Sequence, residues 1–314
     1  MVEQPPPERA GTDAVAIAEG VPEMAADAPG AAAPERSQAR AHKRRSGPMF
    51  WAAIGWLFLV LFCAVFADFL PVKDPNFIDV SLKLADPFTP GRILGGDGLG
   101  RDVLARLVHG ARVSVIISLS AVGIGMTIGG TIGMTIGYVR GRIEQSVVAV
   151  VDIVLAFPAL VILLALVAFL GQNLPVIAFT IGVLSIPIYT RIARANTLSV
   201  AQREFVLASR AMGARRGRIL FREILPNVVL PVMAFGLIQM GLVIVLEGAL
   251  AFLGLSVELP QATWGGMIAE GNRHIFRTLH VVLIPSAVMF FTVLSLNFVG
   301  DTLRSRFDVR ESNL

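Results

Sequence analysis

Apolar residues in this chain gather into six long runs, which are separated by shorter stretches of charged and polar residues. A helix needs about 20 apolar residues to cross the hydrocarbon core of a bilayer. Most of the runs reach that length, and the fourth is interrupted by Pro187. The runs cover roughly 49–70, 113–139, 147–170, 174–189, 228–253 and 281–299. The pattern therefore predicts six membrane-spanning helices.

The polar stretches divide the chain. Residues 1–46, rich in Ala, Pro, Glu and Arg, have no apolar periodicity and are predicted to be a disordered tail. Residues 47–111 hold the first span and a proline-containing polar segment, and 112–300 hold the other five spans. A charged loop at 191–227 joins the fourth and fifth spans, and 301–314 form a C-terminal tail. We expect no cleavable signal peptide, because the first apolar run begins far from the N-terminus.

Composition agrees with an all-α integral membrane fold. The chain is 54% hydrophobic and 16% charged, with a mean hydropathy of +0.70. Soluble domains are about 45–50% apolar and about 25% charged, so the composition favours an integral membrane protein. The single cysteine, Cys63, lies in the first run and rules out a disulfide within the chain.

The distribution of basic residues predicts the topology. With six spans, the side that holds both termini and the charged loop has 19 of the 27 Lys and Arg residues, and the other side has eight. Because Lys and Arg are enriched in cytoplasmic loops, we expect both termini and the loop to be cytoplasmic. Only three of the basic residues are lysines, and the arginines lie mainly between spans. This is not the pattern of a nucleic-acid-binding face.

The second span carries glycines at four-residue intervals, namely Gly125, Gly129, Gly133 and Gly137. Residues four apart share one helix face, so these glycines form a groove that a second helix can approach closely. The partner helix belongs either to the same bundle, which is the simpler interpretation, or to another subunit.

The connection "REFVLASRAMGARRGRILFREILPN" (203–227) is charged, yet it has a helical pattern. Its six arginines keep it out of the hydrocarbon, where charges are costly. Four residues recur at helical spacing, namely Phe205, Ala208, Ser209 and Met212. Gly213 is expected to end this helix, a second short helix is expected at about 215–225, and Pro226 then resets the chain for re-entry. The segment is either a protein docking element or an amphipathic helix on the membrane surface.

Motifs for catalysis are missing from the sequence. No lysine follows a glycine, so there is no Gly-x4-Gly-Lys-Ser/Thr loop for ATP. The four histidines, His42, His109, His274 and His280, lack metalloprotease spacing. A Gly-x-Ser-x-Gly elbow is also absent. We expect a protein that is not an enzyme, with no metal site and no cofactor of its own.

Six stretches together point to a family. Within 203–227, four residues stand at the spacing of Glu-Ala-Ala, three residues, Gly, nine residues, Ile-x-Leu-Pro, namely Ala208, Gly213, Leu225 and Pro226. The other five, in chain order, are "GGDGLGRDVLARLVHGARVSV" (95–115), "DIVLAFPAL" (152–160), "IPIYTRIARANTLSV" (186–200), "LAFLGLSVELPQATWGGMI" (250–268) and "NFVGDTLRSRFD" (297–308). They resemble the peptide/nickel branch of bacterial binding-protein-dependent ABC importer permeases. Leu207, Ser209 and Glu223 depart from the loop signature.

The resemblance implies a type I importer architecture with six transmembrane helices and a cytoplasmic coupling helix at Glu204–Gly213. That helix would seat in a groove of a partner ATPase. The residues implied in coupling are Glu204, Phe205, Ala208, Ser209, Met212, Gly213, Leu225 and Pro226. ATP and Mg²⁺ would be bound by two partner ATPase subunits.

The resemblance also implies the remaining partners and the cargo. A second, different permease subunit would complete the pathway in a bacterial inner membrane, and an extracytoplasmic binding protein would deliver di- or oligopeptides. Nickel or glutathione would suit the same architecture. A self-powered secondary transporter is the runner-up, although the inverted repeats expected of one are not evident.

Polar residues inside predicted spans are candidates for function. They are Glu247, Gln239, Asn297 and Asp152. For Glu247 we weigh pairing with an arginine or helix capping against a role in the pathway. For Asp152 we favour helix packing or an ion pair.

Residues of the predicted external segments are candidates for contact with the binding protein. They are Asp97, Arg101, Asp102 and Trp264. The alternative is structural, with Asp97 as a helix N-cap and the other charges solvated.

Overall fold

The computed structural model describes residues 47–312, and the predicted tail at 1–46 lies outside them. The long elements of the described part are helices, and strand pairing there is limited to two isolated bridges. The helices are α1 (Pro48–Phe66), α2 (Val103–Ile124), α3 (Gly130–Val139), α4 (Arg142–Ala156), α5 (Ala159–Leu170), α6 (Leu174–Val200), α7 (Glu204–Ala211), α8 (Arg216–Ile219), α9 (Leu225–Phe252), α10 (Trp264–Asn272) and α11 (His280–Ser312). A short 3₁₀ turn lies at Val80–Leu82.

Five helical segments are long and apolar enough to cross a membrane. Two are composite: α2 and α3 form one span through a π-helical turn at Gly125–Gly129, and α8 and α9 form another through a π-helical turn at Leu220–Ile224. The pair α4 and α5 is bent by 82° and makes a sixth span if it is counted as one. The predicted all-helical membrane fold is confirmed, and the six predicted spans correspond to five such segments plus the bent pair.

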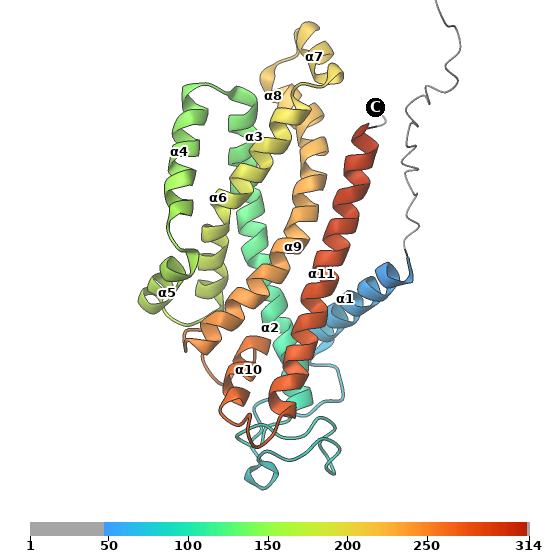
Figure 1. The fold of residues 1–314 in the computed structure, drawn as a ribbon, viewed down its shortest axis with the longest axis vertical. Helices are drawn as coiled ribbons and strands as arrows, with labels where there is room; N and C mark the ends of the chain where they lie inside the picture. Colours follow the sequence, from blue (N-terminus) through green and yellow to red (C-terminus); the bar gives the residue numbers. More distant parts are fainter. Residues whose placement is uncertain (1–46, 313–314) are drawn as a thin grey trace, which may run out of the picture. The chain divides into compact units, whose positions relative to one another are not determined.

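The spans pack around α6 and α9. Helix α6 packs against α2 and α3, and α9 packs against α11, α2 and α6. Helix α1 lies against α2 and α11, and α4 and α5 lie against α6. In Figure 1, α7 and α8 lie at one end of the bundle and α10 lies at the other. We call these the α7 end and the α10 end.

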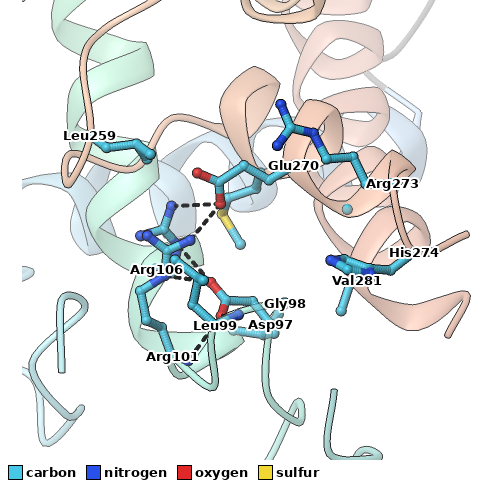
Figure 2. Close-up of a pocket in the computed structure, with 13 residues that line it drawn as sticks. Asp97, Gly98, Leu99, Arg101, Arg106, Leu259, Glu270, Arg273, His274 and Val281 are labelled. Carbon is cyan, nitrogen blue, oxygen red and sulfur yellow. Dashed lines mark hydrogen bonds and ion pairs between the residues drawn. The ribbon is translucent and has the colours of Figure 1, made fainter. Parts of the chain in front are cut away.

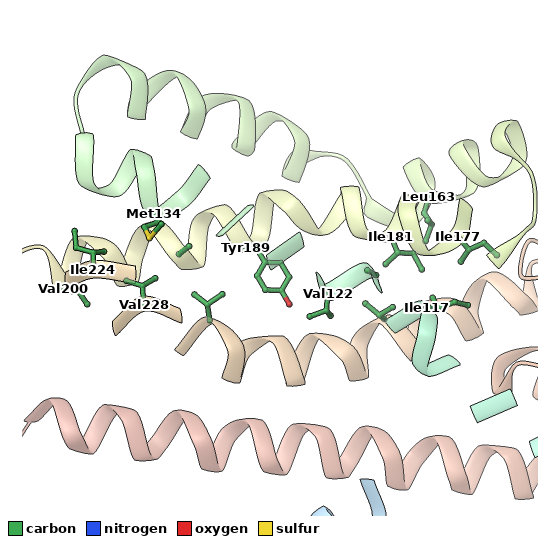
Figure 3. Packing of buried hydrophobic residues seen from close by; sticks show 14 of the residues in the cluster. Ile117, Val122, Met134, Leu163, Ile177, Ile181, Tyr189, Val200, Ile224 and Val228 are labelled. Atoms are coloured by element: carbon green, nitrogen blue, oxygen red, sulfur yellow. The ribbon is translucent and has the colours of Figure 1, made fainter. Parts of the chain in front are cut away.

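The largest apolar core runs between α6 and its neighbours (Figure 3). Tyr189 of α6 is completely buried at its centre, with its ring edge-on to Phe235 of α9 at a centroid distance of 5.4 Å. Leu163 of α5 and Ile177 of α6 extend the core toward the α10 end, and Ile224 extends it toward the α7 end. Because the same core also includes Val206 of α7 and Val228 of α9, it fixes α7 and α9 to one scaffold.

The glycine face of the second span packs within the chain. A Cβ on Gly133 would lie 2.2 Å from the carbonyl oxygen of Thr190, and one on Gly129 would lie 2.4 Å from that of Ile186. Both carbonyls belong to α6, so the missing side chains allow backbone contact between the two helices. The simpler of the two interpretations, packing inside the bundle, is confirmed.

Pro187 does not interrupt the fourth span, contrary to the prediction. Helix α6 continues through it to Val200. A proline lacks the N–H that would bond the carbonyl four residues earlier. Inside a bundle such a loss is tolerated, because neighbouring helices and hydroxyl groups satisfy backbone carbonyls. The hydroxyls of Ser185 and Thr190 bond the carbonyls of Ile181 and Ile186 in the same helix, at 2.8 and 2.9 Å, and not the Val183 carbonyl that Pro187 leaves without its usual donor.

Two other predicted boundaries differ from the structure. Pro226 does not restart the chain, because the helix is continuous through the π-helical turn, in which Leu225 N–H bonds the Leu220 carbonyl five residues back. This wider turn accommodates the proline in the first turn of α9. The polar connection around Trp264 contains the helix α10, and α11 continues past the predicted sixth span into the predicted C-terminal tail.

Candidate functional site

Helix α7 is a short, capped helix between two spans. Glu204 lies in its first turn, where a negatively charged carboxylate interacts favourably with the helix dipole. The helix ends at Ala211, and Gly213 follows with φ of +78°. Gly213 N–H bonds the Arg210 carbonyl at 3.0 Å, and Ala214 N–H bonds the Ser209 carbonyl at 3.1 Å. A residue without a Cβ adopts this left-handed conformation most easily. The helix therefore ends just before Gly213, as the sequence predicted.

The two faces of α7 differ. Val206 and Ser209 are buried against the chain's own core, and Val206 is completely inaccessible. Phe205, Ala208 and Met212 are exposed, and Met212 has 81% of its surface accessible. Spacings of three and four residues place these three on one side of the helix. The exposed side is thus an apolar stripe, whereas Ser209 points inward and away from it.

The last two residues implied in coupling, Leu225 and Pro226, differ in exposure. Leu225 is half-buried and packs against the main core, and Pro226 beside it is exposed. Ile224, the residue before them, is completely buried. This burial anchors the start of α9 beneath α7.

At the α10 end, charged residues form a buried ion-pair cluster (Figure 2). Arg101 Nε donates to Asp97 Oδ2 at 2.6 Å, and its Nη2 lies 2.5 Å from Glu270 Oε2. Arg106 Nη2 lies 3.3 Å from the same Glu270 oxygen, and its Nε lies 3.5 Å from Asp97 Oδ2. Two arginines and two carboxylates compensate one another, as buried charges require. The cluster joins the start of α2 to α10.

Asp102, not Asp97, is the N-cap of α2. Its Oδ1 accepts from the backbone N–H of Leu104 at 2.9 Å, and its Oδ2 pairs with Arg92 at 3.1 Å. Asp97 instead closes the preceding turn, because its Oδ1 accepts from the N–H groups of Leu99 and Arg101. The structural alternative of an N-cap at Asp97 with solvated charges is therefore incorrect, since the acids and arginines are buried and paired.

A cavity of about 190 Å³ lies beside the ion-pair cluster. Its wall includes Arg101, Arg106 and Glu270, together with Arg273 and His274 from the end of α10 and the turn after it. Trp264, at the start of α10, is completely buried. Its indole Nε1 donates to the Leu107 carbonyl at 3.1 Å. In this conformation its side chain offers no surface to another molecule.

Glu247 is buried near the α10 end of α9. Its Oε1 accepts hydrogen bonds from the hydroxyls of Ser256 at 2.5 Å and Thr263 at 2.7 Å. Its structural partners are thus two hydroxyls rather than the arginine considered from the sequence. They connect α9 to the loop that precedes α10.

The other polar residues of the spans have different surroundings. Asp152 pairs with Arg191 at 2.5 Å, an ion pair that is half exposed. Asn297 is half-buried and donates to the Val293 carbonyl of its own helix at 2.8 Å. Gln239 is half-buried in α9. These residues lie on separate helices, and the hydrogen bonds of Asp152 and Asn297 do not join them into one site.

Sequence reasoning missed several members of these clusters. Glu270 lies 169 positions from Arg101, and no local pattern signals such a pair. Arg92 and Arg106 are two of the eight basic residues on the predicted outer side, and the sequence indicated no other role for them. Thr263 carries a signal in hindsight, since threonine before a short helix is a favoured N-cap. Within residues 47–312, no group of three or more His, Cys, Asp or Glu side chains could hold a metal ion.

Solved structures first identify the fold. The chain resembles a chain of the MetNI methionine ABC transporter in an inward-facing crystal form, with a TM-score of 0.55 and 18% identity. The match covers 64% of this chain and 96% of that one. A second crystal form of the same transporter gives a TM-score of 0.53. The two proteins share a fold.

The family follows from the sequence comparisons. Residues 129–313 match the binding-protein-dependent transport system inner membrane component family. The di/tripeptide permease DppC of Pseudomonas aeruginosa is 36% identical over 263 residues, which are 82% of this chain and 87% of that protein. The glutathione permease GsiD of Pectobacterium atrosepticum is 34% identical over 260 residues, with 82% and 86% coverage. The chain belongs to this family, whose members are permease subunits rather than catalytic ones.

Proposed function

We propose that this protein forms half of the translocation pathway of an ATP-driven importer of di- or oligopeptides. The observation that carries the proposal is the exposed apolar stripe of α7, on a short helix outside the spans that ends at Gly213. A membrane span needs no such projecting helix, whereas docking to a separate motor subunit does.

The α7 end is assigned to the cytoplasm. The excess of Lys and Arg in the loops on that side supports this orientation. Both termini then lie in the cytoplasm, and the α10 end faces a binding protein outside the inner membrane. The N-terminal tail supports this orientation only through its basic residues, which belong to the count.

Helix α7 is the proposed coupling helix. Phe205, Ala208 and Met212 would contact a groove of the partner ATPase, because they form the exposed side. Ser209 would hold α7 on its own chain, and Gly213 would permit the turn. Glu204 lies in the exposed first turn, and Leu225 with Pro226 would brace the start of α9.

Motion would begin in two ATPase subunits, which bind ATP and Mg²⁺. Closure of the ATPases would move the coupling helices together and reorient the spans, so that the pathway opens alternately to the two sides. A second, different permease subunit would supply the other half of the pathway. Its arrival would cover spans that face lipid in the single chain.

At the α10 end, Asp97, Arg101 and Asp102 would frame the outer mouth of the pathway. They are largely buried, so they would support the surface on which the binding protein docks and would not contact that protein directly. Trp264 would act behind them by packing. Gln239 and Asn297 remain candidates for the pathway wall, whereas Glu247 and Asp152 take structural roles through their hydrogen bond and ion-pair partners.

Peptide cargo is proposed from the relatives. Dipeptide or di/tripeptide permeases from two bacteria and a glutathione permease are about equally similar to this chain. Glutathione, itself a tripeptide, is therefore an alternative cargo, and nickel is a third from the resemblance alone.

The test is uptake into proteoliposomes that contain the complete complex, with labelled di- and tripeptides, glutathione and Ni²⁺ offered in parallel. We expect ATP-dependent peptide uptake that requires the binding protein. Transport of glutathione or nickel but not of other peptides would correct the cargo. Cation-driven uptake by this chain without ATPase subunits would replace the proposal with a secondary transporter.

A further inference from the structure

A second, larger cavity of about 620 Å³ opens beside α7. Three arginines line it, and each comes from a different element. Arg140 lies in the turn between α3 and α4, Arg210 lies on α7, and Arg216 begins α8. We call this the arginine cavity. Its lining includes no acidic residue.

The three guanidinium groups are not neutralised within the described part of the chain. Two arginines of α6, by contrast, have acidic partners: Arg194 pairs with Glu144 at 2.6 Å, and Arg191 pairs with Asp152 at 2.5 Å. None of the three cavity arginines takes part in an ion pair among residues 47–312. Arg210 lies over the ring of Tyr138, 5.6 Å from its centroid. Three like charges around one hollow favour an anion there.

The cavity lies at the end of a membrane span. Arg140 immediately follows the span Val103–Val139, and Tyr138 stands at the end of that span. Tyrosine is enriched where membranes meet water. Besides the arginines, the wall includes Val139, Leu207 and Ile219. An apolar wall beside a basic one suits a molecule with an acyl chain better than it suits a free ion.

The backbone holds Arg140 in a fixed position. It has φ of +59° and ψ of −173°, a conformation that is ordinarily restricted to glycine. Gly141 follows with φ of +83°. The turn thus sets the direction in which the Arg140 side chain leaves the backbone, toward the cavity that it lines.

We propose that the arginine cavity binds the phosphate group of an anionic phospholipid. Basic pockets between membrane helices on the cytoplasmic side bind such headgroups, so the inference rests on the orientation given under the proposed function. A bound lipid would bridge the α3–α4 turn, α7 and α8. The coupling helix would then be held to the membrane surface by lipid as well as by protein.

The test uses the full-length chain, purified with the subunits that accompany it, and native mass spectrometry to count bound phosphatidylglycerol. The variants are Arg140→Gln, Arg210→Gln and Arg216→Gln, singly and together. Each single change should lower lipid retention about fivefold, because an arginine near anionic lipid contributes on the order of that factor. The triple variant should retain almost none.

Two controls separate charge from folding and position. Arg222→Gln removes an exposed arginine of the same segment that does not line the cavity, and it should leave retention unchanged. Replacement of the three arginines by lysine keeps the charge and should restore most of the retention. Wild-type retention in the triple glutamine variant, or an equal loss in Arg222→Gln, overturns the proposal.

Two further measurements identify the source of the anion. If inorganic phosphate displaces phosphatidylglycerol at low concentration, the site is for free phosphate and the lipid assignment is overturned. If the triple variant loses ATPase subunits while it keeps its lipid, the arginines bind an acidic protein surface instead. Lipid retention is measured in the purified protein and does not require transport. If the transport proposal fails, the dependence of lipid retention on the three arginines can still be measured.

Discussion

Glu247, inside α9, accepts a hydrogen bond at 2.7 Å from the hydroxyl of Thr263, and that same hydroxyl caps the first turn of α10 by accepting from Gly266 N–H at 2.8 Å. One threonine therefore connects a membrane span to the start of a short helix outside it. The backbones also meet here, since a Cβ on Gly265 would lie 2.4 Å from the Cα of Gly248. The position of α10 depends on this junction.

Replacement of Thr263 by valine should loosen α10. The change keeps the shape but removes the cap and one partner of Glu247, and each buried polar group that is left unsatisfied costs about 1–3 kcal/mol. We expect a lower melting temperature of the purified protein in detergent. Glu258→Ala, which alters an exposed acid of the same loop, is the matched control and should melt like the wild type. Equal melting of Thr263→Val and wild type would contradict the junction.

Replacement of Arg106 by methionine should destabilise the ion-pair cluster. Arg106 is buried, and its loss leaves Asp97 and Glu270 with one cation instead of two. Removal of one partner of a buried pair costs about 3–5 kcal/mol. Arg273→Met, at an exposed position on the same cavity, should have little effect.

A double-mutant cycle tests whether these charges act together. The double variant Asp97→Asn, Arg106→Met should lose less stability than the two single variants lose together. Each single variant leaves one charge without its partner, whereas the double variant removes both charges. Strict additivity in thermal unfolding would mean that the two side chains do not interact.

Replacement of Gly133 by alanine should separate α3 from α6. Its Cβ would lie 2.2 Å from the Thr190 carbonyl oxygen, a distance that only backbone movement can relieve. Gly130→Ala on the same helix is the control, since nothing lies within 4 Å of a Cβ there. We expect reduced accumulation of Gly133→Ala in membranes and normal accumulation of Gly130→Ala. Equal accumulation of both variants would contradict close packing on this face.

Replacement of Gly213 by glutamate should abolish uptake while the protein still inserts into the membrane. A Cβ at Gly213 meets nothing within 4 Å, so the chain itself does not exclude a side chain. The loss should come from the left-handed backbone and from the partner surface. Gly213→Asn, which tolerates this conformation better, should retain more uptake. Gly217→Ala is the neighbouring control, and ATP-dependent uptake by Gly213→Glu at the wild-type rate would exclude α7 as the coupling helix.

Cysteine labelling tests the orientation. In a Cys63→Ser background, Phe276→Cys at the α10 end should react with an impermeant maleimide in intact spheroplasts, because Phe276 is fully exposed. Met212→Cys at the α7 end should react only after permeabilisation. The reverse pattern would invert the topology.

The spans were predictable from sequence because a bilayer-spanning helix needs about 20 apolar residues in a row. Runs of that kind are easy to recognise and occur in this protein only in its spans. Pro187 misled the prediction, since a proline in a sequence does not reveal whether the surrounding helices will keep a helix continuous through it. Helix α10 was missed because three of its nine residues are glycines, which have low helix propensity. Its stability comes from a cap and from close backbone packing, both of which involve distant residues.

The sites divide in the same way. Gly213 and the exposed side of α7 follow from local spacing and helix-stop chemistry, so sequence reasoning located them. The inward position of Ser209 did not follow, because the direction of a helix face depends on the core beneath it. Arg106 and Glu270 became partners only through the folding of α10 onto α2.

The π-helical turn at Leu220–Ile224 keeps the helical segment Arg216–Phe252 unbroken over 37 residues. Such a helix is about 55 Å long, well beyond the roughly 30 Å of a bilayer's hydrocarbon. Arg216 beside α7 and Glu247 beside α10 thus lie on one continuous helical segment. The α7 end and the α10 end of the bundle are therefore joined by a single helix that crosses the whole membrane.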